Sequence, residues 1–202
     1  MNKYFKQLVH ELKHHLPFTA SATIIAVVIS VVFIMLSLDI GESIFHSLHI
    51  LHLLASAIVT SAIFYKYKKS VFQTILVGIS GAIIVGSLSD IIFPWLGASI
   101  FQLNPHFHLS IIEIPFMVLG TAFIGSLIGI MTLATKLPHT LHVGISVFAS
   151  MFYLITYVET VNVLSLILSF IIVVISVMIP CCVSDILYPF FFLGKKIKRC
   201  DC

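Results

Sequence analysis

Six long apolar runs, separated by short polar stretches, constrain this chain more than any other feature of its sequence. The runs cover residues 17–38, 46–65, 71–97, 113–134, 138–158 and 162–193. A helix that crosses the hydrocarbon core of a bilayer needs about 20 apolar residues, and each run is of that length or longer. Membrane-spanning strands are about half as long and alternate in polarity, which these runs do not. The sequence therefore predicts an all-α integral membrane protein with six transmembrane helices.

The composition agrees with this class. Charged residues make up 9% of the 202 residues, whereas soluble domains carry roughly a quarter, and the mean hydropathy is +1.15. The first sixteen residues are polar and basic, unlike a cleavable signal. Two of the four cysteines are adjacent at 181 and 182 and two lie in the last three residues, which is not the pattern of a disulfide framework. We predict no soluble domain, phosphate-binding glycine loop, nucleophile elbow or basic nucleic-acid surface.

The basic residues predict the orientation of the chain. All eleven fall at the two termini or in the second and fourth connections: Lys3, Lys6, Lys13, Lys66, Lys68, Lys69, Lys136, Lys195, Lys196, Lys198 and Arg199. Cytoplasmic loops of membrane proteins carry the excess of Lys and Arg. We therefore expect a multi-pass protein of the plasma (inner) membrane with both termini in the cytoplasm.

Three short motifs occur twice in the same order. They are HLPF and EIPF at 15–18 and 113–116, HSLH and HTLH at 46–49 and 139–142, and SDIIFP and SDILYP at 89–94 and 184–189. Each half contributes three helices, so the second half enters the membrane from the opposite side. The sequence predicts two inverted-topology repeats, residues 1–104 and 105–202, as in many secondary transporters and some channels. The alternative is that Pro and His mark helix ends independently in each half.

The repeated motifs carry side chains that bind metal ions. Residues three apart share a helix face, so His46 and His49 can reach one ion, as can His139 and His142. We expect two mirrored clusters. The outer cluster comprises His46, His49, His52, Asp90, His106, His108 and Glu113. The inner cluster comprises His15, His139, His142, Asp185, Cys181 and Cys182.

Counting the helical rise places these clusters near opposite edges of the hydrocarbon, about 25–30 Å apart. We expect two sites joined by an apolar passage, with Pro94 and Pro189 able to break their helices and free carbonyl oxygens as ligands. Structural roles are the alternative for several of these residues. Asp90 and Asp185 would then form hydrogen bonds between helices, and His106 and His108 would be exposed surface residues. Glu113 would support the first turn of its helix.

Imidazole with carboxylate suits Zn, Ni, Co, Mn or Fe(II), and thiolates favour softer ions. We predict a membrane transporter or channel for a divalent transition-metal cation, with proton exchange at the same groups, rather than an enzyme. The expected partners are the lipid bilayer, the metal ion and, as a homo-oligomer, further copies of the chain; nucleic acid is not expected. The alternatives are a His-rich di-metal membrane enzyme, whose ligands gather on one side, and the substrate-binding membrane subunit of an energy-coupled importer. A pore for a small neutral solute would not need so many ionisable groups.

Overall fold

The structure, a computed structural model, describes the main chain of residues 3–38 and 41–193. Within these ranges it describes all side chains except those of residues 3–12, 14, 136 and 182–187. The helices are α1 (Lys3–Met35), α2 (Glu42–Tyr67), α3 (Val71–Ser87), the π-helix η1 (Leu88–Ile92), α4 (Phe93–Ile100), α5 (Ser110–Glu113), α6 (Pro115–Thr132), α7 (Lys136–Tyr157) and α8 (Val163–Leu193). Six helical stretches in this part of the chain are long and apolar enough to cross a membrane. The predicted all-helical class is confirmed.

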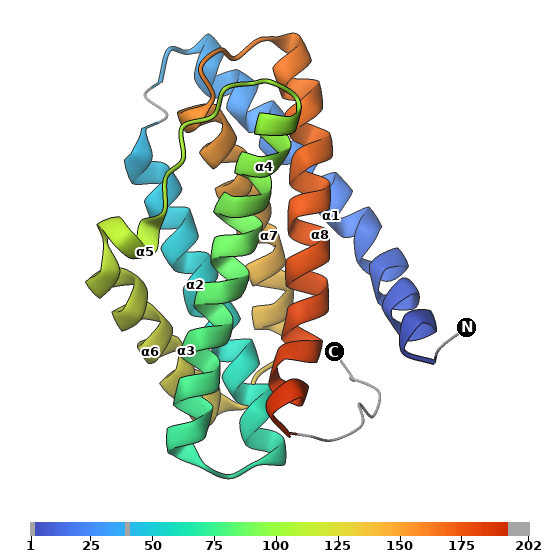
Figure 1. The fold of residues 1–202 in the computed structure, drawn as a ribbon, viewed down its shortest axis with the longest axis vertical. Helices are drawn as coiled ribbons and strands as arrows, with labels where there is room; N and C mark the ends of the chain where they lie inside the picture. The colour runs from blue at the N-terminus through green and yellow to red at the C-terminus, as the bar shows by residue number, and fades with distance from the viewer. Residues whose placement is uncertain (1–2, 39–40, 194–202) are drawn as a thin grey trace.

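Each predicted span corresponds to one helical stretch, and α3, η1 and α4 together form the third. Successive connections alternate between the two ends of the bundle (Figure 1). The α2–α3 and α6–α7 connections lie at the end drawn at the bottom, which we call the lower end. The other three lie toward the upper end, and the longest of them descends along the bundle to the short helix α5. A hydrogen bond from the His106 N–H to the Tyr157 carbonyl, 2.9 Å, ties this loop to the top of α7.

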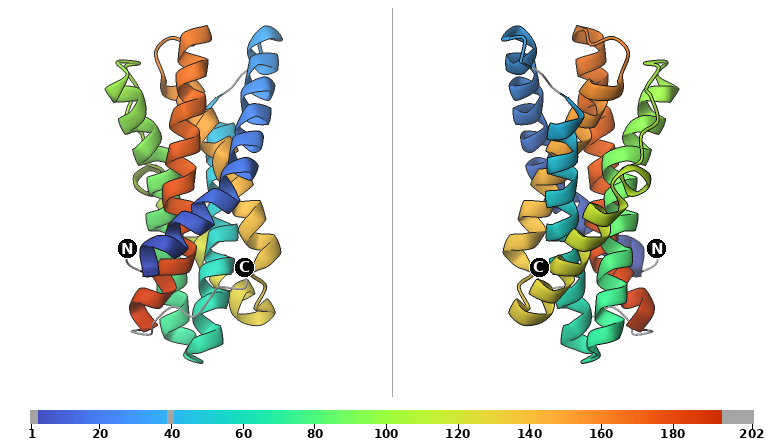
Figure 2. Two further views of the ribbon diagram at one scale, coloured as in Figure 1. Left: turned by 90° about the vertical axis from the view of Figure 1, so that its right-hand side faces the viewer. Right: turned by 90° about the vertical axis from the view of Figure 1, so that its left-hand side faces the viewer.

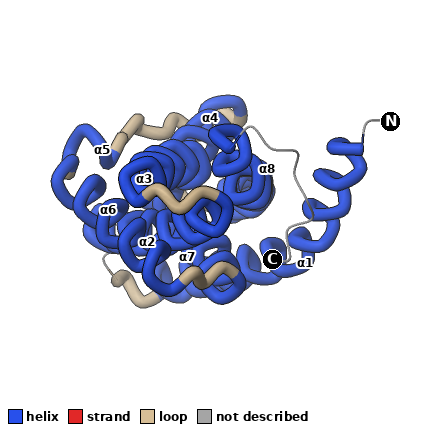
Figure 3. Tube along the Cα trace, turned by 90° about the horizontal axis from the view of Figure 1, so that it is seen from below, coloured by secondary structure: helices blue, strands red, loops and turns tan. Residues whose placement is uncertain are grey.

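The second and fifth spans form the centre of the bundle. In α2 and α7, 67% and 61% of the most apolar stretch is buried, against 28% in both α1 and α6. Seen along the bundle, α1 and α6 lie on opposite flanks (Figure 3), and Figure 2 shows α1 crossing the outside of the other helices. Small side chains such as Ala57 and Ala62 on α2 are fully buried and allow its neighbours to approach. Polar residues on α2 and α7 are therefore held away from lipid.

The third span contains a π-helix just before Pro94, where the sequence suggested a break in the helix. The five residues of η1 lead into α4, and Pro94 takes a position in the first turn of that helix. Proline has no N–H to donate to the preceding turn, and the Ser89 carbonyl in that turn accepts a hydrogen bond from the Ser150 hydroxyl, 3.0 Å. α8 likewise continues through Pro180 and Pro189 to Leu193. The sequence-based suggestion of broken helices at Pro94 and Pro189 is therefore wrong, and the irregularity lies at Asp90 itself, in η1.

Two glycines bring α6 against the main chain of α2. A Cβ added at Gly125 would lie 2.6 Å from the Leu54 carbonyl oxygen, and one at Gly129 would lie 2.4 Å from the Ile58 carbonyl oxygen. Both distances are far below van der Waals contact with backbone that cannot rotate away. The four-residue spacing is that of small-residue interfaces between membrane helices.

We expect Gly129→Ala to destabilise the protein by about 1–3 kcal/mol, the usual cost of overpacking, because α6 must move away from α2. The melting temperature of the detergent-purified protein should fall accordingly. Gly120→Ala is the matched control on the same helix, since a Cβ there meets nothing within 4 Å. Equal melting temperatures for the two variants would contradict the close approach of α6 to α2.

Candidate metal centre

A fully buried carboxylate is held between two histidines at the centre of the bundle. His49 and His52 lie one helical turn apart on α2, and their Nδ1 atoms lie 2.9 Å and 2.7 Å from Oδ2 of Asp90. The side chains are 1%, 0% and 0% exposed. An ionised carboxylate only accepts, so each imidazole donates its Nδ1–H to Asp90. Three residues of the expected outer cluster, His49, His52 and Asp90, therefore contact one another.

The second oxygen of Asp90 accepts from two hydroxyl groups. Ser89 Oγ lies 2.8 Å and Ser146 Oγ 2.6 Å from Oδ1. The carboxylate therefore accepts four hydrogen bonds, which is how a buried charge is tolerated. The π-helix η1 holds Asp90, and such insertions in a helix frequently occur at functional sites.

The other side of His52 faces the second half of the chain. Its Nε2 lies 3.8 Å from Sγ of Cys181 on α8, and its ring stacks on that of His142 on α7, with centroids 5.5 Å apart and planes 10° apart. One ligand atom from each of these three buried residues lies within 4.8 Å of the others. His49, His52 and Asp90 form another such group, so His52 belongs to both.

This contact differs from the expected separation of 25–30 Å between the clusters. The expected separation of about 25–30 Å follows from the helical rise between the outer and inner motif residues, with each helix considered alone. His52 and His142 lie further into the bundle, on antiparallel helices α2 and α7 that pack side by side (Figure 1). The expected apolar passage between two sites is therefore occupied by ligand-type side chains.

A third group, which we call the upper group, is formed by residues of α2, the α4–α5 loop and α5. His108 Nδ1 is 2.6 Å from Glu113 Oε1, and the His46 ring lies 4.9 Å from the His108 ring, centroid to centroid. His46 Nδ1 and His108 Nε2 are buried atoms with no hydrogen-bond partner in the described part of the chain. Burial lowers the pKa of His108 below its usual value, against the opposing effect of Glu113. A neutral imidazole with a free nitrogen can accept a metal ion.

Towards the lower end, three histidine rings follow one another from His52. The ring of His142 lies 5.0 Å from that of His139, which lies 5.0 Å from that of His15 on α1. A cavity of about 200 Å³ is lined by His15 and His139 together with Phe18, Thr140 and Val143. The inner histidines are therefore contiguous with the central group.

Phe45 separates the upper group from the centre. This fully buried ring on α2 has its centroid 5.4 Å from His46, 5.7 Å from His49 and 5.8 Å from His108. The sequence patterns did not indicate a role for Phe45 or for the serines that bind Asp90. A signal existed for two of these three residues: Ser89 is part of the repeated SDI motif, and Ser146 lies one turn beyond His142 on α7.

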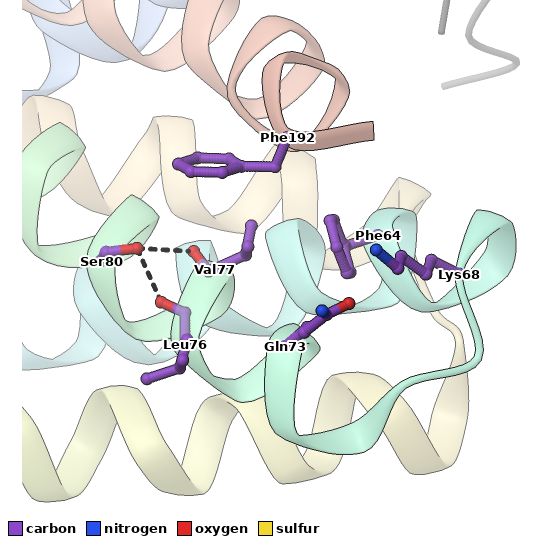
Figure 4. A pocket seen from close by; sticks show the side chains of 7 residues that line it. All are labelled: Phe64, Lys68, Gln73, Leu76, Val77, Ser80 and Phe192. Atoms are coloured by element: carbon purple, nitrogen blue, oxygen red, sulfur yellow. Dashed lines mark hydrogen bonds between the residues drawn. The ribbon is translucent and has the colours of Figure 1, made fainter. Parts of the chain in front are cut away.

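Among the predicted ligands whose side chains are described, His15, His106 and His139 belong to none of the three groups. His106 has an exposed side chain in the α4–α5 loop. The side chains of Cys182 and Asp185 lie outside the described residues. A further cavity, of about 250 Å³, lies between α2, α3 and α8 near the lower end (Figure 4). Its lining of Phe64, Lys68, Gln73, Leu76, Val77, Ser80 and Phe192 includes none of the predicted ligands.

Comparison with protein-family models, with curated proteins and with solved structures finds no match to the chain. The described residues do provide buried His, Asp and Cys groups that could hold a metal ion, inside a bundle of helices apolar enough to cross a membrane.

Proposed function

We propose that this protein carries a divalent transition-metal cation across a membrane, as a transporter or a channel. The observation that carries the proposal is the buried group of His49, His52, Asp90, His142 and Cys181 inside six helices apolar enough to span a bilayer. Ionisable groups are expensive within a membrane, and where they occur they mark ion pathways or proton relays. Imidazole, carboxylate and thiolate together bind ions of the Zn, Co, Ni and Fe(II) class.

The distribution of ligands along the bundle supports a pathway rather than an isolated site. On one side, the upper group of His46, His108 and Glu113 is connected to the centre through Phe45. From the centre, His142, His139 and His15 lead to the cavity near the lower end. An ion could exchange between neighbouring imidazoles along this series. The apolar ring of Phe45 interrupts the series and would block the ion at that point.

The packing of the helices supports the inverted repeat. If the halves are equivalent, α1 corresponds to α6, α2 to α7, and the α3–η1–α4 span to α8. The contact between α2 and α6 then corresponds to the contact between α7 and α1. The contact between α3 and α6 corresponds to that between α8 and α1, and the contact between α2 and α3 corresponds to that between α7 and α8. The motif residues show the same correspondence between the halves. His46 lies next to His108, which contacts Glu113, and their counterparts His139 and His15 lie next to each other.

The proposal includes an orientation. The described lysines of the connections, Lys66, Lys68 and Lys69, lie at the lower end of the bundle (Figure 1). By the positive-inside rule this end faces the cytoplasm of a plasma-membrane protein, with both termini on that side.

A di-metal membrane enzyme is the second candidate, and one observation favours it. Two ligand groups share His52, so ligands from both halves gather in one place, as such an enzyme requires. An enzyme would retain its metal through dialysis, and the metal would be coloured or redox-active. A transporter would exchange its ion readily.

Uptake into proteoliposomes tests the proposed function. We expect the wild-type protein to take up at least one of zinc, nickel, cobalt, manganese and iron(II) above empty liposomes. Asp90→Asn should lower that uptake by about 10–100-fold at subsaturating ion, the usual cost of losing a carboxylate that orients metal-binding histidines. His106→Ala, at an exposed position, should leave uptake unchanged. Uptake equal to that of empty liposomes for every ion, or equal in wild type and Asp90→Asn, would overturn the proposal.

A further inference from the structure

The four hydrogen bonds to Asp90 restrict what this residue can do. Oδ2 accepts from His49 and His52, and Oδ1 accepts from Ser89 and Ser146. A carboxylate has about four lone-pair sites, and protein donors occupy that number. Direct ligation of an ion by Asp90 would therefore require one or more of these bonds to break.

The same hydrogen bonds define which nitrogen of His52 is available. The Nδ1–H of His52 donates to Asp90, so in the neutral ring Nε2 carries the free lone pair. Nε2 is the atom that faces Cys181. A carboxylate that holds one imidazole nitrogen while the other binds metal is the usual outer-shell arrangement of histidine ligands.

The distance between Nε2 and Sγ fits an ion between them. With Zn–N of about 2.0–2.1 Å and Zn–S of about 2.3 Å, a tetrahedral site separates the two atoms by about 3.6 Å. The observed separation is 3.8 Å. His142 brings a third ligand atom within 4.8 Å of the other two, so small rotations of its side chain complete the set.

We propose that His52 Nε2, His142 and the Cys181 thiolate bind the transported ion, and that Asp90 is a positioning residue. The inference rests on the proposed function and narrows its substrate class. Two imidazoles and a thiolate favour zinc and cobalt over manganese, which prefers oxygen ligands. The thiol gives up its proton to the solvent when the ion binds. Three protein ligands leave the fourth tetrahedral position open, which permits the ion to exchange.

Cobalt(II) absorption of the detergent-purified protein tests this site. Wild-type protein loaded with Co²⁺ should show a sulfur-to-cobalt charge-transfer band in the near ultraviolet. Cys181→Ser, a nearly isosteric change, should remove the band, and Cys200→Ser, the same change in the tail, should retain it. Asp90→Asn should retain the band at saturating Co²⁺ but require about 10–100-fold more ion to reach it. A band that persists in Cys181→Ser, or an unchanged affinity in Asp90→Asn, would overturn the assignment.

Ion competition in proteoliposomes provides the second readout. The preference of the wild type for Zn²⁺ over Mn²⁺ should fall by about tenfold or more in Cys181→Ser, on the scale of losing one metal contact. Uptake with no thiolate band would overturn this site and leave transport standing. A thiolate band in a protein that takes up no ion would overturn transport and leave the site standing.

Discussion

Proteoliposomes that contain the double variant His49→Gln, His52→Gln are expected to take up no more transition-metal ion than empty liposomes. Both imidazoles are buried, and His49 belongs to one central group of ligand atoms whereas His52 belongs to both. Glutamine is close to histidine in size, and its amide N–H₂ can still donate to Asp90. It is not a ligand for zinc or cobalt in the way imidazole is. The variant therefore removes metal binding while keeping the buried carboxylate supplied with donors.

The double variant needs a control for folding and one for chemistry. Its melting temperature in detergent should stay close to that of the wild type, which separates loss of transport from loss of structure. His106→Gln makes the same substitution at an exposed loop position and should transport normally. A folded double variant with wild-type uptake would show that the ion does not pass through the centre of the bundle.

The sequence predicts the helices of this protein well because membrane spans depend on local composition. A continuous apolar run of the right length can satisfy its backbone only as a helix, so the six runs indicate six helices without knowledge of their packing. The grouping of His49 and His52 with Asp90 was also predictable, because the helical rise places all three toward the same side of the membrane. The same estimate put His46, His108 and Glu113 in the expected outer cluster.

The composition of the central group was not predictable, because it depends on how α2, α7 and α8 cross. Nothing in the pattern around residue 52 indicates that its ring stacks on His142 and faces Cys181. The π-helix is a further example, since Pro94 suggests a break and the structure has a widened turn at Asp90 instead. The role of Ser146 follows only from the packing of α7 against η1.

Under the proposed repeat, the two halves differ at the centre of the bundle. By the offset of 93 residues that relates the HxxH motifs, His52 corresponds to Ile145, and Leu53 corresponds to Ser146. A strictly symmetric protein would have two equivalent central sites. The replacement of histidine by isoleucine in the second half supports a single central position for the ion, with His52 as its principal ligand.

Transport along the series of histidines requires the two halves to face opposite compartments, so that the series crosses the membrane. Two exposed positions report on this, Ser43 beside His46 and Leu137 beside His139. Single cysteines at these positions, in a background with Cys200→Ser and Cys202→Ser, can be labelled with a membrane-impermeant maleimide in sealed vesicles of known orientation.

We predict that S43C is labelled only from the outside and L137C only from the cytoplasmic side. Labelling of both from one side would mean that α2 and α7 begin in the same compartment. The inverted repeat and the transmembrane series of ligands would then both be contradicted.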